Sequence, residues 1–88
     1  MDVYRLEDTI WLMQSDNYQE RFKAELYQTA IRMGKLYQVI THYDDGSLDF
    51  KPKTPLFILQ KQWEAMNEYL ELLKTRAEIE GIDLTWQG

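Results

Sequence analysis

Aromatic rings and cations gather between residues 18 and 27, where the chain carries Tyr18, Arg21, Lys23 and Tyr27. This combination suits a nucleotide, because an aromatic face stacks on a base while guanidinium and ammonium groups donate charged hydrogen bonds to phosphate. Antiparallel packing of two helices should also bring Arg76 near Arg21. The alternative is that the tyrosines pack at an interface while the cations pair with neighbouring glutamates on a solvated face. Composition alone favours this alternative.

A second candidate anion site lies at Lys51, Lys53 and Thr54, just before Pro55. The free amides and the dipole at a helix N-terminus favour phosphate, and two lysines would add charge. An ordinary capped and charged loop has the same composition. Both interpretations stay open from the sequence.

Catalytic and metal-binding patterns are absent from the sequence. It has no HExxH motif, no glycine-rich phosphate loop and no cysteine, and we interpret the single histidine, His42, as exposed or packed. The spacing of Asp44, Asp45 and Asp49 does not fit a calcium loop and is typical of a solvated turn. We therefore expect a protein that is not an enzyme and that holds no cofactor and no metal.

The formal charge is −5, with 15 acidic and 10 basic residues. A nucleic-acid polymer would meet net repulsion, whereas a small anionic ligand needs only two or three local cations. No apolar run approaches the roughly 20 residues of a membrane helix, and the N-terminus lacks the pattern of a signal peptide. The expectation is a cytoplasmic protein without membrane contact.

Two stretches carry apolar residues at alternating spacings of three and four, which predicts two long helices that face each other. We expect these helices at about 17–43 and 55–80, preceded by a short helix at about 3–13, in one all-α domain over residues 1–88. The long helices form an antiparallel hairpin, and Trp63 is predicted to lie in its core. The residues of the two stripes are Phe22, Leu26, Thr29, Met33, Leu36, Ile40 and Tyr43, then Leu56, Leu59, Trp63, Met66, Leu70, Leu73 and Ala77.

Local signals mark the helix ends. Asp16 with Gln19 resembles a capping box, and Thr54 before Pro55 is typical of a helix start, with proline as the first helical residue. Gly81 is placed to end the second long helix in a left-handed conformation, so that residue 82 folds back onto the last turn. The tail, 82–88, alternates apolar and polar residues and either lies extended against a neighbour or is disordered at its end.

The short N-terminal helix has apolar residues at Val3, Leu6, Ile10 and Met13, with Trp11 beside them, and should pack on the hairpin or on a neighbouring copy.

Apolar residues also lie outside the two stripes. The second long helix carries Ile58, Ala65, Tyr69, Leu72 and Ile79, and the first carries Tyr27, Ile31 and Tyr37. Chains of this length bury only about 60% of their unfolded surface, so a single copy would be marginally stable. Apolar surface on two sides of a helix predicts self-association.

The runs Tyr18–Leu26 (YQERFKAEL) and Leu59–Tyr69 (LQKQWEAMNEY), together with Arg76, resemble small phage proteins that form helical hairpins and sequester cyclic nucleotides. These are the anti-CBASS sponges, whose hairpin is shared with a Thoeris anti-defence protein and with short proteins of crAss-like phages. The resemblance covers about residues 18–80.

This resemblance implies stoichiometric capture of immune second messengers without turnover. The ligands would be cyclic di- or trinucleotides or cyclic ADP-ribose variants, held between the subunits of a homo-oligomer, often a hexamer, in the host cytoplasm. Arg21 matches the arginine that opens the helix in the family, and Tyr18 or Trp11 would stack on the base. The alternative function is a structural or regulatory protein that oligomerises or docks a partner helix without any small ligand.

Overall fold

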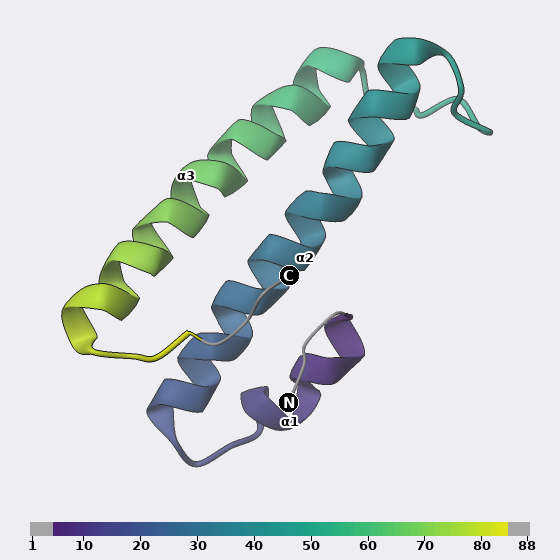
Figure 1. Cartoon of the computed structure of the whole chain (residues 1–88). Helices are drawn as coiled ribbons and strands as arrows, with labels where there is room; N and C mark the ends of the chain where they lie inside the picture. Colours follow the sequence, from purple (N-terminus) through teal and green to yellow (C-terminus); the bar gives the residue numbers. More distant parts are fainter. Residues whose placement is uncertain (1–4, 85–88) are drawn as a thin grey trace.

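The computed structural model describes residues 5–84, and these residues contain helices and loops without strands. A 3-10 helix, η1 (Leu6–Thr9), leads directly into α1 (Ile10–Met13), and two long helices follow, α2 (Tyr18–Asp45) and α3 (Leu56–Glu80). Figure 1 shows α2 and α3 as an antiparallel hairpin, with the N-terminal segment on the other side of α2. The predicted all-α class, with one short helical segment and two long helices, is confirmed. Both long helices begin one residue later than predicted, and α2 ends two residues later.

The N-terminal segment buries a different face from the one predicted. Thr9 and Leu12 are buried and Leu6 packs against the core, whereas Ile10 and Met13 are about half exposed. A 3-10 helix has three residues per turn, so positions 6, 9 and 12 lie on one side of the segment. The prediction assumed α-helical periodicity from the start, and its residue 3 lies outside the described residues.

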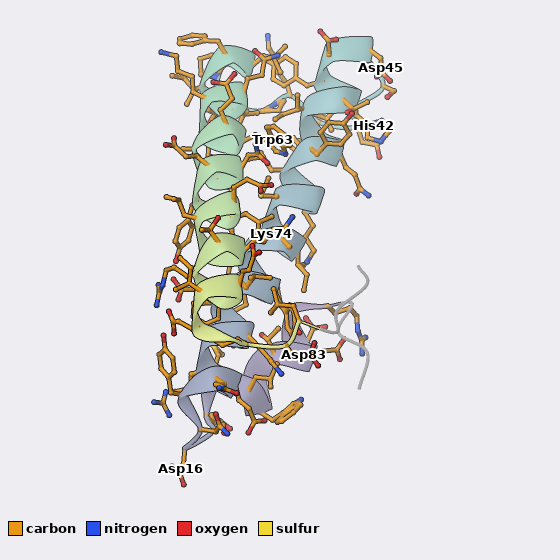
Figure 2. The ribbon with its side chains drawn as sticks, turned by 60° about the vertical axis from the view of Figure 1, so that its left-hand side comes forward. Asp16, His42, Asp45, Trp63, Lys74 and Asp83 are labelled. Atoms are coloured by element: carbon orange, nitrogen blue, oxygen red, sulfur yellow. The ribbon has the colours of Figure 1, made fainter. Side chains whose placement is uncertain are left out.

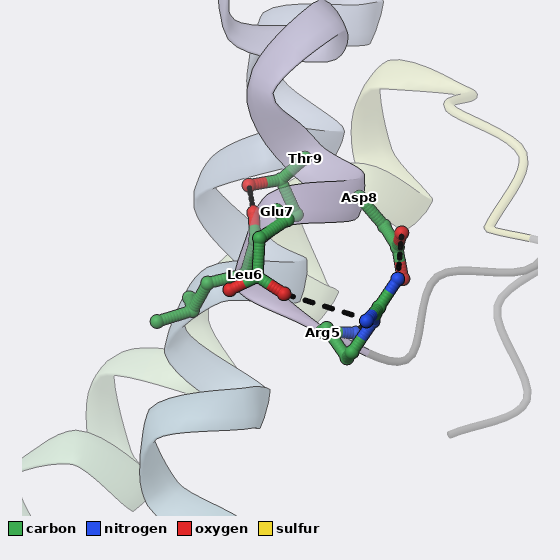
Figure 3. A network of polar contacts seen from close by, with 5 residues as sticks. All are labelled: Arg5, Leu6, Glu7, Asp8 and Thr9. Atoms are coloured by element: carbon green, nitrogen blue, oxygen red, sulfur yellow. Dashed lines mark hydrogen bonds and ion pairs between the residues drawn. The ribbon is translucent and has the colours of Figure 1, made fainter.

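Hydrogen bonds hold this segment on α2. The Thr9 hydroxyl is fully buried; it donates to the carbonyl oxygen of Leu6 (2.7 Å) and accepts from Nε2 of Gln28 on α2 (2.9 Å). At the start of η1 the backbone amide of Arg5 donates to the Asp8 carboxylate (3.0 Å), and the Arg5 guanidinium lies 3.8 Å from the same carboxylate (Figure 3). The buried polar group is therefore fully satisfied, which a stable core requires.

The start of α2 is capped by Asn17, whose side-chain oxygen accepts from the amides of Gln19 (2.8 Å) and Glu20 (3.4 Å). The N-cap is therefore Asn17, and the capping box predicted from Asp16 and Gln19 is wrong. At its other end, α2 stops at Gly46, which adopts a left-handed conformation with φ of 78°. The solvated turn predicted from Asp44, Asp45 and Asp49 begins at this glycine.

The two ends of α3 are formed in different ways. Pro55 takes the N-cap position in an extended conformation and no side chain caps the helix, so the predicted cap by Thr54 is wrong. Gly81 ends α3 with φ of 69°, and the amide of Ile82 donates to the carbonyl oxygen of Ala77 (2.8 Å). Ile82 is buried, which confirms the predicted fold-back.

The core is concentrated in the half of the hairpin that contains the start of α2 and the end of α3. Leu12 of α1 and Ile82 join the helices there as a third layer, which completes the burial. Toward the loop end the predicted stripe residues are only half-buried, because no third layer covers them. The buried hydrophobic residues are Leu12, Phe22, Ala24, Leu26, Tyr27, Ile31, Met33, Leu70, Leu73, Ala77 and Ile82.

The face of α3 that points away from α2 remains exposed. Leu72 and Ile79 retain 59% and 78% of their accessible surface, and Ile58 and Tyr69 are also exposed. Within residues 5–84 the N-terminal segment contacts α2 and does not contact α3, so it leaves this face uncovered. No helix in the same range is both long enough and apolar enough to cross a membrane.

Candidate functional site

The two ends of the hairpin domain meet at Tyr18 and Arg76. Tyr18 is the first residue of α2, and Arg76 lies one turn before the end of α3. Nη2 of Arg76 donates to the Tyr18 hydroxyl oxygen (3.0 Å), and that hydroxyl donates to Oε1 of Glu80 (2.9 Å). Nε of Arg76 lies 3.4 Å from Oε2 of Glu80, one helical turn away. Antiparallel packing therefore joins Tyr18 to two polar groups of α3, which follow it in the sequence by 58 and 62 residues.

Phe22 completes this group, which we name the Tyr18 cluster (Tyr18, Phe22, Arg76 and Glu80). The Arg76 guanidinium carbon lies 4.9 Å from the centre of the Phe22 ring, and the Tyr18 and Phe22 rings are 6.3 Å apart. Phe22 is buried, while Tyr18 remains 48% exposed. Arg76 therefore rests on an aromatic surface and still reaches solvent, a typical cation–π arrangement.

Electrostatics keep Arg76 charged. Desolvation acts against the charged guanidinium, but the charge and hydrogen bonds of Tyr18 and Glu80 outweigh it, so the pKa of Arg76 is raised above its ordinary value. The cluster thus presents a permanent cation and an exposed aromatic ring. Glu80 is the only carboxylate with which Arg76 forms an ion pair among residues 5–84.

The remaining residues of the predicted site are placed apart from this pair. Nη1 of Arg21 donates to the backbone carbonyl of Ser15 (2.8 Å), so this guanidinium holds the turn before α2. Tyr27 is 96% buried in the core, Lys23 is half-buried on α2, and Trp11 belongs to the N-terminal segment and is 44% exposed. The structure brings Arg76 to Tyr18, whereas the sequence predicted it near Arg21.

Two members of the cluster were missed by the sequence reasoning. Glu80 lies four residues after Arg76, and Phe22 lies four residues after Tyr18. Residues four apart are neighbours on a helix surface, so this spacing in the sequence could have indicated that Glu80 lies beside Arg76 and Phe22 beside Tyr18. Phe22 was assigned only to the packing stripe, although its ring also supports the guanidinium.

A groove on the opposite part of the hairpin provides a second aromatic surface. It has a volume of about 500 Å³ and is lined mainly by apolar side chains, including Tyr37 from α2 and Trp63 from α3, with Lys74 at its edge. The two rings lie 6.2 Å apart. Figure 2 shows Trp63 and Lys74 on the side of α3 that faces α2. Trp63, predicted as core, is half-buried and forms part of the groove wall.

The loop between α2 and α3 contains a hollow of about 380 Å³, lined by Lys51 together with Asp49 and Phe50. Lys53 and Thr54 are not among the residues that line it. Of the predicted second anion site, Lys51 therefore lines this hollow, and Asp49 beside it opposes an anion.

Local hydrogen bonds hold His42 and the acidic turn that follows it. His42 is exposed, as predicted, and its Nδ1 lies 2.7 Å from the Ser47 hydroxyl. Ser47 donates to Asp45 through its amide (2.9 Å) and its hydroxyl, and these bonds lower the pKa of Asp45. Residues 5–84 contain no group of three or more histidine and acidic side chains placed to hold a metal.

Comparison with known proteins gives one match. A family model described as Sequestin matches residues 16–79. This range includes Tyr18, Phe22 and Arg76, and Glu80 follows it directly. No curated protein and no solved structure shows significant similarity to the chain.

Proposed function

The chain belongs to the Sequestin family, and on this premise we propose that it binds and sequesters cyclic nucleotide messengers of host immunity. It acts by stoichiometric capture and does not convert the ligand, so that the messenger no longer reaches its receptor. In a phage-infected cell this would counteract anti-phage defence from the cytoplasm. The family name itself indicates sequestration; the ligand class is our inference.

The observation that carries the proposal is the Tyr18 cluster. A cyclic nucleotide needs a flat surface for its base and a cation for its phosphate, and the pair of Tyr18 and Arg76 offers both within 3.0 Å. The ring of Tyr18 is about half exposed, so one side is available to a base. Support from Phe22 limits the conformations of Arg76, which lowers the entropy lost on binding.

Glu80 sets a condition on the ligand. Its carboxylate accepts from both Tyr18 and Arg76, so a phosphate must displace it or share the guanidinium. A guanidinium has five donors and can hold both groups from different sides. A neutral aromatic ligand would leave the Glu80 contacts intact, and a phosphate-bearing ligand would weaken them.

The test is a thermal-shift and calorimetry screen with cyclic dinucleotides, cyclic trinucleotides and cyclic ADP-ribose isomers. Ligand at a hundredfold excess over Kd adds about 2.7 kcal/mol to stability, which corresponds to roughly 10 °C or more for a chain of this size. Heat-denatured complexes should then release the ligand chemically intact in a chromatographic assay. If no ligand of the panel raises the melting temperature, the proposal is refuted. If the released ligand is chemically altered, the protein is an enzyme and not a sequestering protein.

A matched pair of tyrosine variants locates the binding surface. Tyr18→Ala removes the ring of the cluster, whereas Tyr37→Ala removes a similarly exposed ring from the α2–α3 groove. We expect Tyr18→Ala to abolish the thermal shift and Tyr37→Ala to retain it. The reverse result would place the ligand in the groove and contradict the assignment to Tyr18.

One feature favours a second function, an interaction protein without a small ligand. The exposed apolar face of α3 is a suitable docking surface for a helix, whether or not the protein binds nucleotides. The two functions are separated by the same screen. A chain that associates with a partner helix but shows no thermal shift with any messenger has the second function.

A further inference from the structure

We propose that the side of the hairpin beside Tyr37 and Trp63 is a binding site for a small organic cation that carries a methylated ammonium group. The site has five residues, which we name the aromatic flank: Tyr37, Ile40, Gln60, Trp63 and Glu64. None of them belongs to the Tyr18 cluster, so this proposal does not depend on the binding of a messenger.

The aromatic flank borders a hollow of about 340 Å³ toward the loop end of the hairpin. Small-molecule pockets commonly have volumes of roughly 300–1,000 Å³, so this hollow suits a small ligand. Tyr37 and Trp63 also line the α2–α3 groove, so the hollow and the groove adjoin. A Cβ atom at Gly34 in that groove would meet no other atom within 4 Å, so the groove is open there.

The two rings of the flank can hold one cation together. Their centroids are 6.2 Å apart and their planes are tilted by 48°, so they form two walls of one hollow instead of a closed stack. A cation is attracted by an aromatic face within about 6 Å of the ring centroid, and a position between the walls satisfies this distance for both rings. Tyr37 is 58% exposed and Trp63 is half-buried, so a ligand can reach both.

The chain itself places no cation on these rings. Within residues 5–84, the guanidinium that lies over an aromatic ring is that of Arg76, over Phe22 at the other end of the hairpin. Lys74 lines the groove but not the hollow, and its Nζ lies 3.7 Å from Oε1 of Glu71. Figure 2 shows Trp63 and Lys74 at different levels of α3. The rings of the flank therefore remain available to a cation from solution.

Glu64 supplies the charge that attracts a cation. Its side chain is exposed and forms no ion pair within the described part of the chain. It lines the hollow one helical turn from Gln60, whose amide oxygen can accept a hydrogen bond. An anion would be repelled by this carboxylate and by the negative faces of the rings, whereas a cation is attracted by both. The charge of the hollow therefore selects a cation.

The apolar walls select a methylated nitrogen. A plain ammonium group is strongly hydrated and would lose water against Tyr37, Ile40 and Trp63 without gaining equivalent hydrogen bonds. A quaternary ammonium group has no N–H to satisfy, and its methyl groups pack against the rings while its charge acts on the ring faces. The small volume of the hollow favours a free molecule over a segment of protein.

The first experiment is an NMR titration of the isotope-labelled full chain at constant ionic strength. Choline chloride is compared with dimethylbutanol, its neutral analogue, in which a carbon atom replaces the charged nitrogen. We expect choline to shift the Trp63 indole signal and the amide signals of Tyr37 and Glu64 in a saturable way. The alcohol should bind about tenfold more weakly, because it lacks the charge.

Two results of this titration would overturn the proposal. Equal affinities for choline and the alcohol would show an apolar hollow without preference for a cation. Absence of saturable shifts at the flank, or shifts confined to the Tyr18 cluster, would show that the cation does not bind here. Tighter binding of N-acetyl-lysine amide than of choline would contradict the assignment to a small methylated cation and would identify a partner's lysine as the occupant.

The second experiment uses matched variants on α3. Glu64→Gln should weaken choline binding by roughly two- to fivefold and leave the alcohol unaffected, since an exposed carboxylate contributes modestly to an ion pair. Glu68→Gln removes an equally exposed carboxylate that does not line the hollow and should leave both affinities unchanged. Equal weakening by the two variants would show a general effect of net charge and refute the role of Glu64.

Trp63→Leu tests the rings. This variant keeps an apolar side chain at the position and removes the aromatic face, so the preference for choline over the alcohol should fall while the amide signals outside the flank keep their positions. A retained preference would exclude Trp63 from the site. Failure of the messenger screen would leave all these results unchanged, because the two sites share no residue.

Discussion

The neighbouring residues Leu72 and Leu73 provide a test of the packing. Leu73 is 1% exposed and belongs to the buried core of the hairpin, whereas Leu72 is 59% exposed on the outer face. Both are leucines in the same helix, so Leu73→Ala and Leu72→Ala change the same atoms and nearly the same helix propensity. Any difference in stability between the two variants therefore results from the different burial of the two side chains.

Burial sets the size of the expected effect. Leucine-to-alanine changes in packed cores cost about 2–5 kcal/mol, from lost transfer energy and from the cavity that remains. A chain of this length has a total stability of roughly 4–13 kcal/mol, so Leu73→Ala should remove a large fraction of it. Leu72→Ala should stay within about 0.5 kcal/mol of the natural chain when the protein is dilute.

The assay is urea unfolding followed by circular dichroism at several protein concentrations. We expect a lower midpoint for Leu73→Ala with an unchanged slope, at every concentration. Leu72→Ala should differ from the natural chain only at high concentration, where the self-association that the sequence predicts through this face of α3 would contribute to stability. Equal losses for the two variants in dilute protein would refute the burial that the structure assigns to them.

Three further predictions concern single polar groups. Asn17→Ala should destabilise the chain by about 0.5–2 kcal/mol in the same unfolding assay, because the amides at the start of α2 lose their acceptor. Ser47→Ala should raise the pKa of Asp45 toward its ordinary value of 3.8 in an NMR titration. Since the folded-state pKa is lowered, these bonds stabilise the turn above pH 3.8, and their contribution is lost as the pH falls through the folded-state pKa. Glu80→Gln should tighten the binding of a phosphate-bearing ligand in calorimetry, because the carboxylate that competes for Arg76 is removed; weaker binding would show that Glu80 supports the site.

The candidate site was only partly accessible to sequence reasoning. The pattern selected Tyr18 and Arg76 as members, and the structure joins them, because antiparallel packing brings the start of α2 to the end of α3. The pattern also selected Tyr27, but the structure buries this residue. The apolar spacing of a helix does not indicate which of its sides another segment will cover. The hydrogen bond between Arg21 and the Ser15 carbonyl depends on the path of a turn, which periodicity does not describe.

The sequence by itself determined the helices and their antiparallel arrangement. Apolar spacing, Gly81 and the turn at Gly46 act through local geometry, so each can be interpreted from a few neighbouring residues. The tertiary structure alone decided where the core is dense. The N-terminal segment begins as a 3-10 helix and packs Leu12 against one half of the hairpin, which leaves the other half of the stripe only partly buried. Burial is a property of contacts between distant segments, and for that reason the same heptad pattern gives a sealed core at one end and an aromatic groove at the other.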